Sequence, residues 1–93
     1  MDPLKTLEKQ SGFMRLISYL AESGEKPLTT ILDETGIPVH QLYASIGKAK
    51  ELGLVKTRMD SSVYPPRNLV SLTDKGKKIG IKIGEIVEIM ESD

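Results

Sequence analysis

The chain contains no cysteine and no tryptophan, and it has a single histidine, His40. It therefore offers no disulfide, no thiolate or multi-histidine metal site and no cysteine nucleophile. No apolar run approaches the ~20 residues of a membrane span, and no basic-then-apolar leader is recognisable. We expect a cytoplasmic protein that needs neither a metal nor another cofactor.

Signatures of the common catalytic sites are also missing. The sequence has no G-x-S-x-G, no phosphate-binding glycine loop and no convincing acid–base pair, and Glu85 and Glu88 are adequately explained as solvated helix residues. A chain of 93 residues suffices for one core of helices with a small sheet, but not for a large enclosed pocket as well. We therefore expect one domain over residues 1–93 and no enzymatic activity.

The chain has no net charge, because 13 Lys and Arg residues balance 13 Asp and Glu residues, but the charges are unevenly distributed. Residues 38–82 hold nine of the cations and three of the acids, a net charge of +6. Residues 1–37 carry −2 and residues 83–93 carry −4. Such asymmetry favours a polyanion-binding face in the middle of the chain, although a chance clustering of solvated charges would look the same.

Hydrophobic periodicity predicts a short helix near Leu4 and Leu7 and then three core helices. The first core helix starts at Phe13 and ends at Gly24, the second opens at Pro27 and ends at Gly36, and the third spans about 38–52 and ends at Gly53. Only about three residues separate the second helix from the third, so the two helices must cross steeply.

After Gly53 the period changes. Residues 54–59 and 68–72 are short, extended-looking segments, and the stretch between them contains Pro65 and Pro66. This pattern predicts a β-hairpin with a stiffened tip. Thr73 and Asp74 then cap a last helix, in which apolar residues recur at spacings of 4, 3 and 4: Ile79, Ile83, Ile86 and Met90.

Three motifs in this order carry a resemblance to a known family. They are the turn at 33–38 (DETGIP), the end of the third helix at 49–55 (AKELGLV) and the start of the last helix at 72–76 (LTDKG). The order resembles the winged helix-turn-helix of MarR- and ArsR-like prokaryotic regulators and of small archaeal winged-helix proteins. The implied fold is mainly α, with a three-helix core, a two-stranded wing and a C-terminal helix. Residues 1–10 would form an N-terminal extension, 11–72 the core and 73–91 the last helix.

Within this resemblance, the helix at 38–52 is the recognition helix that enters the major groove of DNA, and the hairpin at 54–72 is the wing on the backbone. His40 and Gln41 would read base edges. Tyr43 would either donate to phosphate or pack on the core. The other candidate DNA contacts are Ala44 and Gly47, which are small, and Lys48, Lys56, Arg58 and Arg67, which are cationic. The recognition face lacks arginine, which weakens the expectation of strong guanine readout.

The apolar stripe on the last helix needs a partner surface. One alternative is packing on the chain's own N-terminal helix at Leu4 and Leu7. The other is a homodimer in which two last helices pair, with glycines at 76, 80 and 84 allowing close approach. The expected interface residues are Ile79, Gly80, Ile83, Ile86, Val87 and Met90.

The sequence therefore predicts a transcriptional regulator that binds double-stranded DNA as a homodimer. The resemblance also allows a small-molecule effector, since MarR-like proteins bind ligands between the dimer helix and the DNA-binding part. No residue of this sequence indicates which ligand that would be. The alternative is a winged-helix module that binds another protein within a larger complex, because a fold does not fix a function.

Overall fold

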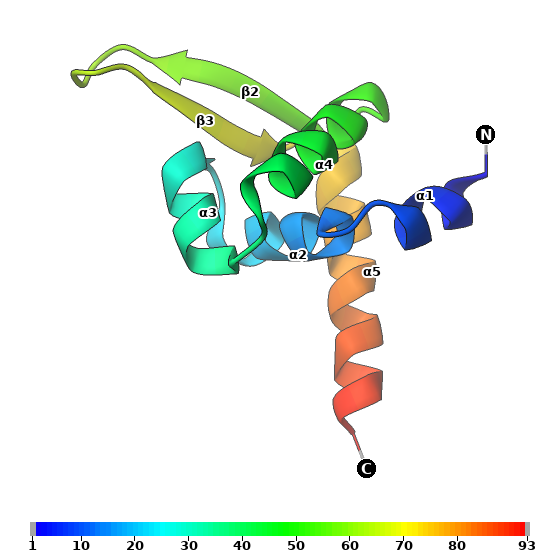
Figure 1. Ribbon diagram of the computed structural model, residues 1–93. Helices are drawn as coiled ribbons and strands as arrows, with labels where there is room; N and C mark the ends of the chain where they lie inside the picture. The colour runs from blue at the N-terminus through cyan, green and yellow to red at the C-terminus, as the bar shows by residue number, and fades with distance from the viewer. Residues whose placement is uncertain (1, 93) are drawn as a thin grey trace.

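The computed structural model describes residues 2–92. A cluster of helices lies beneath a projecting β-hairpin, and a long last helix runs away from both (Figure 1). The elements in chain order are α1 (Pro3–Lys9), α2 (Phe13–Ser23), β1 (Lys26–Pro27), α3 (Leu28–Thr35), α4 (Val39–Glu51), β2 (Val55–Asp60), β3 (Arg67–Leu72) and α5 (Asp74–Glu91). The predicted order of core helices, hairpin and closing helix is confirmed.

One apolar core joins α2, α3 and α4 to the sheet and to the first half of α5. The apolar face predicted for α2 is fully buried, and the chain leaves α2 and α3 through Gly24 and Gly36, which have φ angles of 76° and 69°. Glycine adopts these left-handed angles without steric cost, so both helices end where the sequence indicated. The largest fully buried side chains are Phe13, Leu16, Ile17, Ile31, Leu42 and Val70.

The sheet has three strands, in the order β1-β3-β2, rather than the two that we predicted. Lys26 and Pro27 pair with Val70 and Leu69, and β2 pairs antiparallel with β3 from Val55↔Leu72 to Asp60↔Arg67. Pro27 was expected in the first turn of the second helix, but it lies in β1 and at the N-cap of α3. A two-residue strand is too short to show the period of two that reveals longer strands.

Helix α5 begins where the sequence predicted. The Thr73 hydroxyl accepts a hydrogen bond from the Gly76 amide at 3.1 Å and donates one to the Gly53 carbonyl at 2.6 Å. Lys75 donates to the Leu52 carbonyl at 3.0 Å. These bonds fix the start of α5 against the end of α4, so the recognition helix and the last helix keep a defined relation.

The glycines of α5 have a different role from the one that we expected. A Cβ atom built on Gly76 would lie 2.0 Å from the Leu54 carbonyl oxygen, and one on Gly80 would lie 2.6 Å from the Ala21 Cβ. Both glycines are buried against their own chain. The close packing of α5 on the rest of its own chain therefore requires glycine at positions 76 and 80. Of the three α5 glycines, Gly84 alone has open space around its Cβ position.

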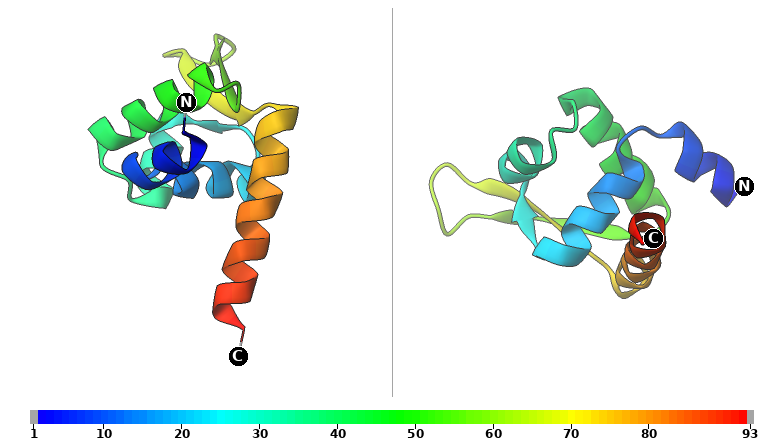
Figure 2. Two further views of the ribbon diagram at one scale, coloured as in Figure 1. Left: turned by 90° about the vertical axis from the view of Figure 1, so that its right-hand side faces the viewer. Right: turned by 90° about the horizontal axis from the view of Figure 1, so that it is seen from below.

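The apolar stripe of α5 divides into two parts. Its first part packs on the core, because Ile83 is buried and Ile79 is half-buried against it. Of the two expected partners on the N-terminal helix, Leu7 is half-buried and lines a hollow with Ile79, whereas Leu4 is exposed. Its second part extends beyond the helical core (Figure 2) and leaves Ile86, Val87, Ile89 and Met90 exposed. Of the six expected interface residues, three therefore face solvent in the single chain: Ile86, Val87 and Met90.

Candidate nucleic-acid interface

Helix α4 presents one open face. His40, Tyr43, Ala44 and Gly47 are exposed on it, and no atom lies within 4 Å of the position that a Gly47 Cβ would occupy. Gln41 and Lys48 are half-buried at its margins. Tyr43 points to solvent with 57% exposure, so packing on the core is excluded for it. Val39, in the first turn of α4, is also exposed, at 52%.

The opposite face of α4 holds the helix on the core. Leu42, Ser45, Ile46 and Ala49 are buried there. The Ser45 hydroxyl donates to the Ser11 carbonyl at 3.1 Å and thereby joins α4 to the segment between α1 and α2. Sequence reasoning missed Ser45, because a serine carries no apolar signal and its partner lies 34 residues away. These contacts hold α4 against the rest of the chain and leave its other face open.

The cations predicted to bind DNA are mostly paired with acids of their own chain. Arg58 makes two hydrogen bonds to the Glu25 carboxylate, at 2.7 and 3.0 Å. Arg67 lies 3.6 Å from Asp60, and Lys48 lies 3.8 Å from Glu51. Lys56 has no ion pair among residues 2–92. Sequence analysis did not foresee these pairs. Glu51 and Asp60 are already counted in the net charge of +6 of residues 38–82, so only Glu25 brings a negative charge from outside that segment.

The pKa values of Glu25, just before β1, and of Asp60, at the end of β2, are both lowered. Hydrogen bonding from Arg58 holds the pKa of the Glu25 carboxyl below its ordinary value. The pKa of Asp60 is also lowered, chiefly by hydrogen bonds from the Ser62 hydroxyl and amide and further by the nearby Arg67. Both carboxylates are therefore ionised at neutral pH. The Asp60 bonds also fix the first residues of the hairpin tip.

A bond between the Lys50 amine and the Thr57 hydroxyl, at 3.3 Å, connects α4 to β2. Because β2 follows α4 after a short turn, the base of the wing lies beside the C-terminal end of α4. The wing then projects past α3 to a free tip (Figure 1).

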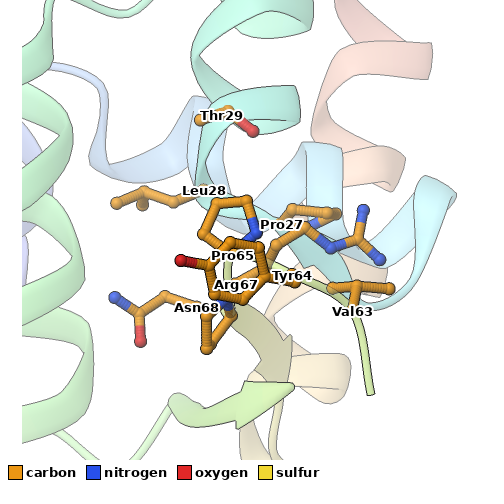
Figure 3. Close-up of a pocket in the computed structure, with 9 residues that line it drawn as sticks. Pro27, Leu28, Thr29, Val63, Tyr64, Pro65, Arg67 and Asn68 are labelled. Atoms are coloured by element: carbon orange, nitrogen blue, oxygen red, sulfur yellow. The ribbon is translucent and has the colours of Figure 1, made fainter. Parts of the chain in front are cut away.

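Two hollows lie outside this interface. One, of about 490 Å³, separates the wing tip from the start of α3 and is lined mainly by apolar side chains, including Pro27, Leu28, Tyr64 and Pro65 (Figure 3). The other, of about 560 Å³, lies between α2 and α5, with Met14, Ile86, Val87 and Met90 along it. Arg15 and Tyr19 also line the second hollow, and the Tyr19 hydroxyl donates to Glu34.

Within residues 2–92, no helix has the length and apolar character needed to span a bilayer. The same residues hold no cluster of three or more potential metal-ligating side chains.

Neither a protein-family model nor a curated protein sequence matches the chain, whereas solved structures do. NadR in complex with 4-hydroxyphenylacetate is 25% identical, with a TM-score of 0.76, and the match covers 95% of this chain but 62% of NadR. AF1382 from Archaeoglobus fulgidus is 26% identical, with a TM-score of 0.73 over 99% of this chain and 100% of that one. The PcaV transcriptional regulator from Streptomyces coelicolor is 19% identical, with a TM-score of 0.76 over 90% of this chain and 61% of that one.

These similarities extend over nearly the whole of the present chain, which spans about three fifths of the length of NadR and of PcaV. TM-scores of 0.73–0.76 show that the chain resembles these structures in its three-dimensional arrangement. The resemblance to winged-helix transcriptional regulators that the sequence indicated is confirmed, and the chain has the winged-helix fold.

Proposed function

We propose that this protein is a DNA-binding transcriptional regulator that inserts α4 into the major groove and lays the hairpin wing along the DNA backbone. The exposed face of α4 is the observation that carries the proposal. It combines polar groups at His40 and Tyr43 with the small residues Ala44 and Gly47, which let the helix lie close to base edges. The structural neighbours add support, since one of them, AbfR, is described bound to DNA.

The contacts proposed for this mode divide into two groups. His40 and Gln41, in the first turn of α4, would meet base edges, and Tyr43 would donate its hydroxyl to a phosphate. The cations Lys48, Lys56, Arg58 and Arg67 would meet phosphates, and three of them would exchange a carboxylate partner for the DNA. That exchange reduces the net gain from each contact, so the binding should be moderate.

We further propose that the protein acts as a homodimer through the far half of α5. Ile86, Val87, Ile89 and Met90 form an exposed apolar surface around its last turns, which a second copy would bury. A dimer would carry two α4 helices, which could enter successive major grooves ~34 Å apart on a pseudo-palindromic site. The hollow between α2 and α5 borders the same surface, and a small-molecule effector would have room there.

Selection of bound duplexes from a random pool tests this function. The protein should enrich a pseudo-palindrome, and light scattering should give the mass of a dimer. With four phosphate-contacting cations in each subunit, log K should fall with log[salt] with a slope of about −7. Failure to bind any duplex at about 50 mM salt would refute the function, and a monomer would refute the dimeric mode alone.

The neutralised wing favours a second candidate, a module that binds another protein. Arg58 and Arg67 are both paired with acids of the same chain, and the tip exposes the apolar side chains of Val63 and Tyr64. A partner captured by pull-down would then stay bound at high salt, whereas DNA would be released.

A further inference from the structure

Three lysines from distant parts of the chain meet at one hollow between α1 and α4. This hollow has a volume of about 260 Å³, and the residues that line it are all polar or charged: Asp2, Lys5, Thr6, Lys9, Gln10 and Lys48. Lys5 and Lys9, the two α1 lysines, are exposed and lie one turn apart, so they share one side of α1. Like charges at this spacing destabilise a helix, so stability does not explain why the lysines gather there.

The α1 lysines are not neutralised by acids in the part of the chain that the structure describes, because neither amine forms an ion pair there. Asp2 also lines the hollow, but its carboxylate caps α1 by accepting hydrogen bonds from two amides of the first turn, at 3.1 and 3.3 Å. Glu8, the acid within α1, lines a different hollow. Three lysines and one carboxylate give the hollow between α1 and α4 a net charge of +2, which suits an anion.

Two side-chain hydrogen bonds define the margin of α4 on which this hollow lies. The Lys50 amine donates to Thr57 in β2 at 3.3 Å, and the Ser45 hydroxyl donates to the Ser11 carbonyl, just after α1, at 3.1 Å. At about 100° per residue, Lys50 points about 140° away from Ser45 and about 200° away from Lys48. The base of the wing therefore flanks one margin of the open face of α4, and α1 flanks the other. Figures 1 and 2 show the same order, with α4 between α1 and the wing tip.

A duplex on the open face of α4 would meet both margins. The major groove is about 12 Å wide and a helix is about 10–12 Å across, so one sugar–phosphate backbone runs along each margin of an inserted helix. Lys48 lies one turn beyond the exposed Ala44, about 6 Å further along the axis, on the margin toward α1. Its solvent-exposed pair with Glu51, at 3.8 Å, is weak enough to yield to a phosphate. The α1 lysines adjoin Lys48 and so lie beside the backbone on the side away from the wing.

We propose that Lys5 and Lys9, together with Lys48, bind the DNA backbone along the margin of α4 opposite the wing. This inference rests on the proposed DNA-binding function and adds two cations to the four of α4 and the wing. The linear charge pattern hides the contact, because both α1 lysines belong to the segment 1–37, which has a net charge of −2. With the two added cations, the slope of log K against log[salt] becomes steeper than the value of about −7 that four cations in each subunit give.

The test compares the full-length parent with the double variant Lys5→Gln/Lys9→Gln on the selected duplex, by fluorescence anisotropy from about 50 to 200 mM salt. Loss of one phosphate contact reduces the steepness of the slope by about 0.9, so the double variant should lose at least about 0.9 for each bound subunit. Binding should therefore be at least about 15-fold weaker at ~50 mM salt and about fourfold weaker at ~200 mM. The variant Lys5→Arg/Lys9→Arg keeps both charges and should bind within about twofold of the parent.

Helix α5 offers a matched control for the loss of two positive charges. Lys78 and Lys82 are also exposed and also lie one turn apart, on the side of α5 opposite the buried Gly76 and Gly80. Lys78→Gln/Lys82→Gln should keep the affinity and the salt slope of the parent. Glutamine has nearly the helix propensity of lysine, so the melting temperatures of the parent and both glutamine variants should agree within a few degrees.

Phosphate ethylation interference locates the contact on the duplex. Ethylation neutralises one phosphate at a time, and it should weaken binding of the parent at phosphates on both backbones beside the α4 site. With Lys5→Gln/Lys9→Gln, the interference should disappear along one backbone and persist along the other. Interference that is identical for the parent and this variant would contradict the proposed position of the α1 lysines.

Three results would overturn the inference. The first is parent-like DNA binding by Lys5→Gln/Lys9→Gln, which would favour a free anion as the ligand of the hollow. The second is an equal loss in the α5 control, because the effect would then reflect net charge alone. The third is weaker binding with an unchanged slope, because the contact would then not be ionic. If the parent binds no duplex, the proposed function itself fails, which is distinct from a parent that binds and a variant that binds equally well.

Discussion

Replacing Gly76 with alanine should destabilise the protein strongly, although alanine normally favours a helix by at most about 1 kcal/mol. The new Cβ would lie 2.0 Å from the Leu54 carbonyl oxygen and 3.1 Å from the Leu72 Cδ2. Relief of that overlap requires a shift of roughly 1 Å between the start of α5 and the base of the wing, and overpacking of this kind costs about 1–3 kcal/mol.

The same shift disturbs two hydrogen bonds. Leu54 also accepts from the Thr73 amide at 2.9 Å, and Thr73 caps α5 through the Gly76 amide. Each bond is worth about 1 kcal/mol. The net loss should therefore be about 3 kcal/mol, which lowers the melting temperature of a chain of this size by roughly 12–24 °C. Thermal unfolding followed by circular dichroism measures the change.

Gly84 supplies the matched control on the same helix. No atom lies within 4 Å of its Cβ position, so Gly84→Ala should raise the melting temperature by about 4–8 °C through helix propensity alone. Equal effects of the two substitutions would refute the reasoning. A concentration-dependent loss of stability in Gly84→Ala would instead indicate that a second copy approaches α5 closely at this glycine.

Three further perturbations have defined outcomes. Ser45→Ala should cost about 1 kcal/mol in urea unfolding, because it removes the hydrogen bond that the buried Ser45 hydroxyl donates to the Ser11 carbonyl. Glu25→Gln should lower the melting temperature at neutral pH. Because the folded-state pKa of Glu25 is lowered, the stabilisation is present above the ordinary carboxyl pKa and is lost as the pH falls through the folded value. The melting temperatures of parent and variant should therefore converge in acid. A difference that stays constant with pH would contradict the role of Arg58. Ile86→Asp should weaken the proposed dimer by about 30-fold or more in sedimentation without lowering monomer stability, whereas an unchanged mass would exclude this face.

The order of the helices and the ends of α2 and α3 followed from the sequence, because apolar periodicity and glycine stops act over a few neighbouring residues. Contacts between distant residues did not follow. The bond from Arg58 to Glu25 spans 33 residues, and the short strand β1 exists only because β3 pairs with it. The glycines of α5 were recognised as sites of close approach, but only the fold shows that Gly76 and Gly80 approach their own chain.

The candidate interface could likewise be predicted where it depends on neighbouring residues, but not where it depends on distant ones. Helical geometry alone places His40, Ala44 and Gly47 on one face of α4, and that face is open. The electrostatics of the wing required the folded structure, because the acids that neutralise its cations come partly from outside the wing.

The most direct test of the account places a carboxylate on the open face of α4. Gly47→Glu has room for its side chain, so the melting temperature should not fall, and the new charge and bulk would face the phosphates and the floor of the major groove. The account predicts that the parent binds the selected duplex and that Gly47→Glu binds it at least about 100-fold more weakly. Parent-like binding by a folded Gly47→Glu variant would contradict the claim that α4 contacts DNA.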